Sequence, residues 1–103
     1  MRSVTVEEPL INYMLAIVHQ TRHHDNLALG VSPRGSQALY RAAQALALLE
    51  GRSYAIPDDF KRLAVSVFAH RIVINTRYAS TLKKSEQAEA IIREILDSTE
   101  VPL

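Results

Sequence analysis

One helix in this sequence is marked at both of its ends, and it limits the folds that are open to the chain. Ser32 can accept hydrogen bonds from the free amides of a first turn, and Pro33 suits the first helical position, where its missing N–H costs nothing. Gly51 supplies the left-handed residue at which many helices end. These signals predict a helix from about Pro33 to Glu50. Its expected apolar face comprises Leu39, Ala42, Ala43, Leu46 and Leu49.

Three further segments show helical periodicity. The first is predicted over about Glu7–His23, the second starts at Pro57, and the third runs from a Ser85 cap to about Ser98. Because Ile56 carries no capping oxygen, we expect the helix that begins at Pro57 either to start less firmly or to be capped by Asp58. The residues expected to be buried are, in chain order, Leu10, Tyr13, Met14, Ile17 and Val18; Phe60, Leu63, Ala64, Val67 and Phe68; and Ile91, Ile92, Ile95 and Leu96.

Short extended pieces separate these helices. They are predicted within 24–31, at 54–56 and at 72–74, and a polar connector is predicted over 75–84. Strands of this length cannot build a sheet core. The predicted fold class is therefore mainly all-α, a four-helix bundle with very short β segments, in a single domain of 103 residues.

Composition removes several function classes. The chain has no Cys, which excludes disulfides, thiolate zinc sites and a cysteine nucleophile. Twelve Lys and Arg against eleven Asp and Glu leave a net charge of +1, without the basic excess typical of nucleic-acid binders. No apolar stretch has the length of a membrane span and no signal-like block opens the chain. We expect a soluble cytoplasmic protein with no membrane partner.

Two local patterns imitate known sites but lack their reactive residues. Gly30 and Gly35 have the glycine spacing of a phosphate-binding loop, but no Lys follows them and a Pro interrupts the run. His19 and His23 have the spacing of a zinc protease pair, but Gln20 stands where the general base would be. We therefore predict neither a metal site nor a catalytic site within this chain.

Arg34 is the remaining candidate. It falls in the first turn of a well-capped helix, where the guanidinium and the positive helix end together favour an anionic oxygen such as a terminal phosphate. From the physics alone, the alternative of a solvated or ion-paired surface charge stays open.

The segment Leu29-Gly30-Val31-Ser32-Pro33-Arg34 closely resembles the G-[AV]-S-P-R motif of the MoxR family of AAA+ ATPases. Other pieces of the chain are similar to that family in order and spacing. They are Tyr13 with Thr21-Arg22, Leu49-Glu50-Gly51-Arg52-Ser53-Tyr54, Pro57-Asp58-Asp59 and His70-Arg71-Ile72. Ile56 and Gly35 depart from the pattern, where Thr or Ser and Ala are common. The Gly is expected to loosen the first helical turn by about 1 kcal/mol.

The resemblance implies that residues 1–103 form the C-terminal helical lid of such an ATPase, without the αβα nucleotide-binding domain. It assigns Arg34 as the sensor 2 arginine, supported by Ser32 and Pro33, and makes Arg22, Arg52 and Arg71 interface candidates. For the last three, hydrogen bonding at helix ends is the simpler alternative.

The implied function is a lid that closes over Mg-ATP and couples hydrolysis to chaperone-like remodelling of other proteins. The lid alone would bind no ATP or Mg²⁺ and would not be an enzyme. The implied partners are the αβα domain of the same protein, neighbouring subunits of a ring, and proteins with von Willebrand factor A domains. The alternative is a small helical module that binds DNA or protein through the helix starting at Pro33. That helix carries only two basic residues, Arg34 and Arg41, which disfavours DNA binding.

Overall fold

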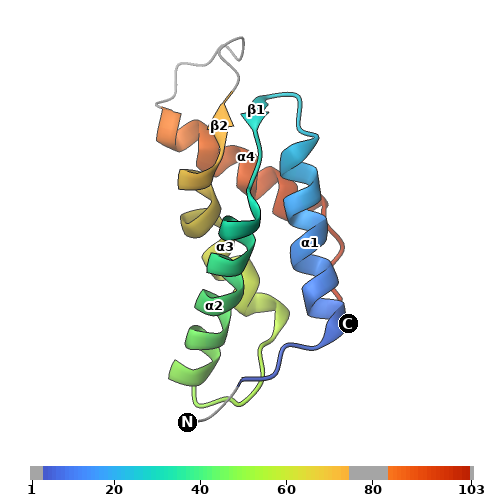
Figure 1. The fold of residues 1–103 in the computed structure, drawn as a ribbon, viewed down its shortest axis with the longest axis vertical. Helices are drawn as coiled ribbons and strands as arrows, with labels where there is room; N and C mark the ends of the chain where they lie inside the picture. The colour runs from blue at the N-terminus through green and yellow to red at the C-terminus, as the bar shows by residue number, and fades with distance from the viewer. Residues whose placement is uncertain (1–3, 75–83, 103) are drawn as a thin grey trace.

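The computed structural model describes residues 4–74 and 84–102 and shows a helical bundle (Figure 1). Its helices are α1 (Glu8–Arg22), α2 (Pro33–Leu49), α3 (Pro57–Phe68), the one-turn 3₁₀ helix η1 (Ala69–Arg71) and α4 (Lys84–Ser98). Its strands are β1 (Leu27–Leu29) and β2 (Val73–Ile74). The mainly-α prediction is confirmed. Within the described ranges, no helix combines the length and the apolarity that crossing a bilayer would require.

Helix α2 has the predicted ends. The Ser32 side chain accepts a hydrogen bond from the Gly35 amide at 3.4 Å, Pro33 opens the helix, and Gly51 adopts a φ of 77° just after it. The predicted apolar face is wrong at its last position, because Leu49 is 85% exposed. The buried row of α2 runs instead through Leu39, Ala43 and Ala47. Leu49 lies two positions beyond this row, about 200° around the helix axis.

The small residues of that row allow α3 to approach closely, and α2 packs more extensively on α3 than on any other element. All residues expected to be buried on α1 and α4 are buried. On α3 the largest side chains, Phe60 and Phe68, are fully enclosed with Ala64, while Leu63 and Val67 lie at the margin of the core. The core thus joins all four long helices.

Two helix starts differ from the prediction. At α3 the residue that reaches back is Asp59, whose Oδ2 accepts a hydrogen bond from the Ile56 amide at 2.8 Å; the expectation of an Asp58 cap was wrong. Asp59 occupies the third helical position, from which an acidic side chain reaches the amide of the residue before the helix. Helix α4 begins at Lys84, so Ser85 lies inside its first turn and is not its cap. Of the polar connector predicted over 75–84, residues 75–83 lie outside the described ranges.

Two small β pairings join segments that are distant in sequence. Strands β1 and β2 pair antiparallel, with Leu27 opposite Ile74 and Leu29 opposite Val73. Near the other end of the bundle, Thr5 forms a parallel bridge with Tyr54. The Thr5 amide donates to the Ser53 carbonyl, and the Ala55 amide donates to the Thr5 carbonyl, both at 2.9 Å. The extended segments predicted at 54–56 and 72–74 are confirmed, whereas their partners were not predictable.

Candidate functional site

Arg34 is the second residue of α2 and lies exposed on the surface. Within residues 4–74 and 84–102, no hydrogen bond or ion pair involves its side chain. The first turn of α2 also contains no acidic residue that could neutralise it. The guanidinium therefore lies beside the positive end of a capped helix and is free to meet an anion from outside the bundle.

The residues just before α2 are fixed to the end of α1. The Val31 amide donates to the Thr21 hydroxyl at 3.0 Å, and the Nε of Arg22 donates to the Val31 carbonyl, also at 3.0 Å. The Thr21 hydroxyl in turn donates to the Val18 carbonyl at 2.6 Å. We call the Thr21 and Arg22 bonds to Val31 the Thr21–Arg22 clamp. It secures both polar backbone groups of a buried residue three positions before Arg34.

Two glycines allow this close packing. A Cβ at Gly30 would lie 2.7 Å from backbone atoms of Thr21 and Arg22, so the segment between β1 and α2 can touch α1 only without a side chain there. A Cβ at Gly35 would lie 2.6 Å from Cγ1 of Val31 and 3.1 Å from Cδ of Arg71. Gly at position 35, where the family commonly has Ala, therefore leaves room for Val31 and Arg71 to pack on the first turn of α2.

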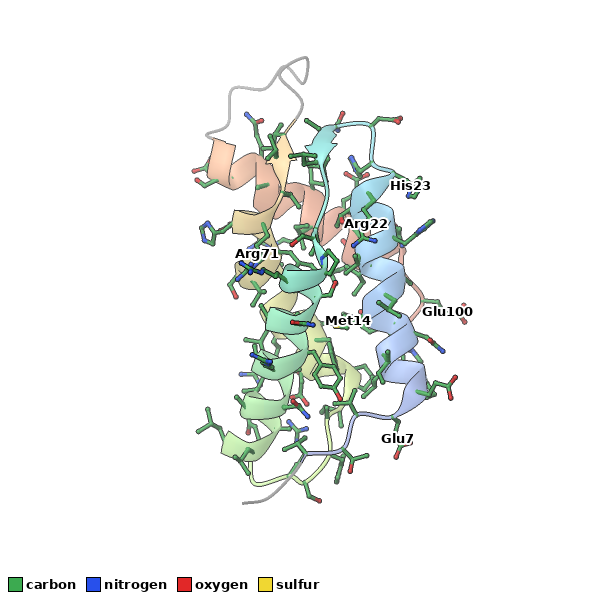
Figure 2. The ribbon with its side chains drawn as sticks, in the orientation of Figure 1. Glu7, Met14, Arg22, His23, Arg71 and Glu100 are labelled. Carbon is green, nitrogen blue, oxygen red and sulfur yellow. The ribbon has the colours of Figure 1, made fainter. Side chains whose placement is uncertain are left out.

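Arginines from two other elements flank the start of α2. Figure 2 shows Arg22 of α1 on one side and Arg71 of η1 on the other, and the contacts of Val31 and Gly35 with them agree. Arg71 is exposed, as its interface candidacy requires, and this role stays a prediction. Positive charge thus gathers around the end of α2 that carries Arg34.

A shallow groove of about 700 Å³ runs between α1 and the start of α2. Its polar lining includes Arg22, His19 and Ser36, and its apolar lining includes Leu15, which is half exposed. The groove lies along the same helix end as Arg34. It is open enough to be a contact surface rather than an enclosed pocket.

Arg52, the remaining interface candidate, is engaged within the chain. Its two terminal nitrogens donate to both carboxylate oxygens of Asp59, at 2.8 and 2.6 Å, and one of them also donates to the Tyr54 carbonyl at 3.1 Å. Asp59 is only 1% exposed. The hydrogen bond with Asp59 raises the pKa of Arg52. These contacts give Arg52 a structural role at the start of α3; its interface role stays a prediction.

The histidines near the end of α1 make local contacts. Nδ1 of His23 lies 2.9 Å from the His19 carbonyl oxygen, and the two rings are 4.2 Å apart. Nε2 of His24 lies 3.6 Å from Oε1 of Glu94. Among the residues with described positions, no three His, Asp or Glu side chains are grouped so that they could hold a metal ion.

Sequence reasoning missed two buried polar residues, one at each end of α2. Thr21 entered only as part of a motif, although it is buried and bonds to Val31, ten positions away. Asp59 likewise entered only as part of a motif, although it is buried and accepts two hydrogen bonds from Arg52. In both cases the partner is brought close by the turn of the chain, and no periodic pattern marks such a contact.

Comparisons with known proteins agree with this architecture. Residues 19–95 match the family model described as the AAA lid domain. The chain is 43% identical over 102 residues to the uncharacterized protein YeaC of Bacillus subtilis. The aligned region covers 99% of this chain and 31% of that protein. It is 31% identical over 106 residues to the chaperone MoxR1 of Mycobacterium tuberculosis, covering 94% of this chain and 27% of that protein.

A solved structure shows the same fold. The crystal structure of a protein from Cytophaga hutchinsonii, described as "a putative ATPase", superposes with a TM-score of 0.85 at 28% identity and covers 98% of this chain and 32% of that one. The chain thus spans about a third or less of the length of each of these three proteins. The resemblance to the MoxR family is confirmed, and the chain belongs to the AAA lid domain family, with MoxR proteins among its relatives.

Proposed function

We propose that this chain is the lid of an AAA+ ATPase, and that it closes over ATP and senses the terminal phosphate through Arg34. The observation that carries the proposal is the exposed Arg34 side chain, which has no partner within residues 4–74 and 84–102 and lies in the first turn of a helix capped by Ser32. The AAA lid family match and the similarity to MoxR proteins support it.

Arginine suits this task for physical reasons. It stays charged at any working pH and offers several N–H donors in one plane, which match the oxygen atoms of a phosphate group. The N-terminus of α2 adds a fixed positive potential beside it. A phosphate that gains charge during hydrolysis would therefore be stabilised where Arg34 reaches it.

The other parts of the active site would come from the rest of the complete protein. Within the part of the chain that the structure describes, no three acidic or histidine side chains are grouped so that they could hold a metal ion. In this proposal the Mg²⁺ ligands come from the αβα domain. An αβα domain would bind Mg-ATP, and neighbouring subunits of a ring would complete the assembly. The lid alone would hydrolyse nothing.

The proposed cellular role is chaperone-like remodelling in the cytoplasm, driven by the movement of this lid. It is supported by the relative named chaperone MoxR1. Proteins with von Willebrand factor A domains are the proposed clients.

The test is Arg34→Ala in the complete ATPase, with kcat measured at saturating ATP. Arginines that stabilise phosphoryl transfer are worth about 10³ to 10⁵ in rate, so we expect a large fall in kcat, equivalent to several kcal/mol of barrier. Arg41→Ala is the matched control, because Arg41 is the other exposed arginine of α2 and lies two turns away. It should keep the parental rate. Near-parental hydrolysis by Arg34→Ala, at an unchanged oligomeric state, would contradict the proposal.

A further inference from the structure

We propose that Thr21 and Arg22 are positioning residues for Arg34. Resting on the function proposed for Arg34, this inference states that the Thr21–Arg22 clamp fixes where α2 begins relative to α1, and so where the sensing guanidinium is presented. Arg22, in this view, acts within the chain and does not need to touch ATP or another subunit.

The clamp holds one residue by both of its backbone groups. The Val31 amide donates to the Thr21 hydroxyl and the Val31 carbonyl accepts from Nε of Arg22, each over 3.0 Å. Thr21 and Val31 are both 1% exposed, so water cannot replace the first of these bonds. The bond from Arg22 is charge-assisted, which makes it stronger than one between neutral groups. Two successive residues of α1 thus fix the orientation of this peptide segment.

The clamped residue contacts the first turn of α2 directly. Cγ1 of Val31 lies 2.6 Å from the position that a Cβ on Gly35 would take, and Gly30 sits against the backbone of Thr21 and Arg22. Between Val31 and Arg34 stand only the Ser32 cap and Pro33, whose ring fixes the backbone φ angle. Little freedom remains between α1 and Arg34, so a displacement of the clamp would move the arginine.

Arg22 lies exposed on the surface, which is compatible with a positioning role. Its side chain lines the groove between α1 and the start of α2, and it adds a positive charge near Arg34 without a neutralising partner within the described chain. A residue whose only role is core stability would be buried. Thr21 is buried, whereas Arg22 is exposed. Because one clamp residue is buried and the other exposed, and both bond to Val31, variants of the two can separate stability from positioning.

The experiment is a double-mutant cycle in the complete ATPase. Thr21→Val removes the hydroxyl while keeping the shape, and Arg22→Met removes the donor while keeping the length of the side chain. Each is made alone and together with Arg34→Ala. We expect each single variant to lower kcat about tenfold with KM little changed, and to cause no further loss in the Arg34→Ala background.

Controls distinguish positioning from general damage. Thr21→Ser keeps the hydroxyl and should restore most of the rate, and Arg41→Met should be silent. If Thr21→Val fails to fold, Arg22→Met carries the test, because the exposed Arg22 is outside the core.

Three outcomes would overturn the inference. Unchanged kcat in Arg22→Met while Arg34→Ala is impaired shows that the clamp does not position Arg34. Equal losses with and without Arg34 show that the clamp acts independently of it. A parental rate in Arg34→Ala itself rejects the proposed function, and the positioning role with it.

Discussion

Asp59 has two functions at the start of α3. One carboxylate oxygen accepts from the Ile56 amide and from Arg52, and the other accepts from Arg52 alone. Burial raises the pKa of Asp59, but the hydrogen bonds from Arg52 and Ile56 and the nearby guanidinium charge outweigh it, so the pKa lies below its ordinary value of 3.8. The folded chain thus holds this carboxylate in its charged form.

This shift predicts acid sensitivity. Because the pKa of Asp59 is lower in the folded chain than in the unfolded one, the stability it contributes is complete above about pH 4 and is lost as the pH falls through the folded pKa. Asp59→Asn should be less stable at neutral pH by about 1–3 kcal/mol, because bonds to charged and buried groups are lost. It should also show a flatter dependence of unfolding free energy on pH below 4.

Urea unfolding at a series of pH values measures both effects. Asp58→Asn is the control, since Asp58 is exposed and directly precedes Asp59. Equal pH profiles for Asp59→Asn and the parental chain would show that the buried pair is not the acid-sensitive group.

At the scale of single residues, the sequence predicted the chemistry of a side chain better than it predicted which residue that side chain contacts. Arg34 is exposed and has no side-chain partner within residues 4–74 and 84–102, as a sensing role requires. Arg52 was an interface candidate with hydrogen bonding at a helix end as the alternative; its bonds to Asp59 fit the alternative, and its interface role stays a prediction. The sequence shows an arginine and two aspartates seven or fewer positions apart. It does not show which aspartate the turn between α2 and α3 brings to the guanidinium.

At the scale of elements, α2 shows how periodicity can place a helix correctly and still assign one wrong surface residue. The ends of α2 follow from local hydrogen-bonding needs, and the sequence marks them with Ser32, Pro33 and Gly51. Its buried face depends on where α3 lies. The row of small residues ending at Ala47 faces α3, and the larger Leu49 points elsewhere.

Two matched variants test this orientation. Leu39→Ala should lower the unfolding free energy by about 2–5 kcal/mol, because Leu39 is fully buried and its loss leaves a cavity. Leu49→Ala removes the same atoms from an exposed position and should change it by less than about 0.5 kcal/mol. Thermal or urea unfolding measures the difference. A comparable loss for both variants would mean that the end of α2 is packed differently.

At the scale of the whole molecule, the segment before α1 adds backbone hydrogen bonds to the core contacts that already join α1, α2 and α3. Thr5 exchanges backbone hydrogen bonds with Ser53 and Ala55, and the Gln44 side chain donates to the Val4 carbonyl at 3.0 Å. Val4 itself is buried. The chain that leads into α1 is therefore attached to the turn between α2 and α3, at the end of α2 opposite to Arg34 (Figure 1).

Thr5→Pro tests the importance of this attachment. Proline removes the amide that donates to Ser53, so we expect a loss of about 1–3 kcal/mol in unfolding free energy. The amide of Ala55, which donates to Thr5, should exchange with solvent faster. Thr5→Ala keeps both backbone bonds and should behave as the parental chain, because the Thr5 side chain is exposed. Unaltered exchange at Ala55 in Thr5→Pro would argue against the bridge.

Only those parts of the overall fold that depend on local sequence patterns could be predicted from the sequence. Helix number, helix order and most buried stripes follow from periodicity, but the pairing of Thr5 with residues 53–55 and of β1 with β2 joins positions more than forty residues apart. Short polar and extended segments carry no signal for a distant partner. These pairings depend on how the helices pack, which no single segment encodes.

The attachment at Thr5 has a mechanical consequence. If the chain were pulled at Val4, the hydrogen bonds of Thr5 with Ser53 and Ala55 would bear the force first. The turn between α2 and α3 would therefore feel the pull before α1 does. With 17 residues, α2 is about 25 Å long, with the Thr5 attachment near its C-terminal end and Arg34 at its N-terminal end. A tilt of about 10° would sweep the guanidinium through about 4 Å, roughly the difference between touching a phosphate oxygen and missing it.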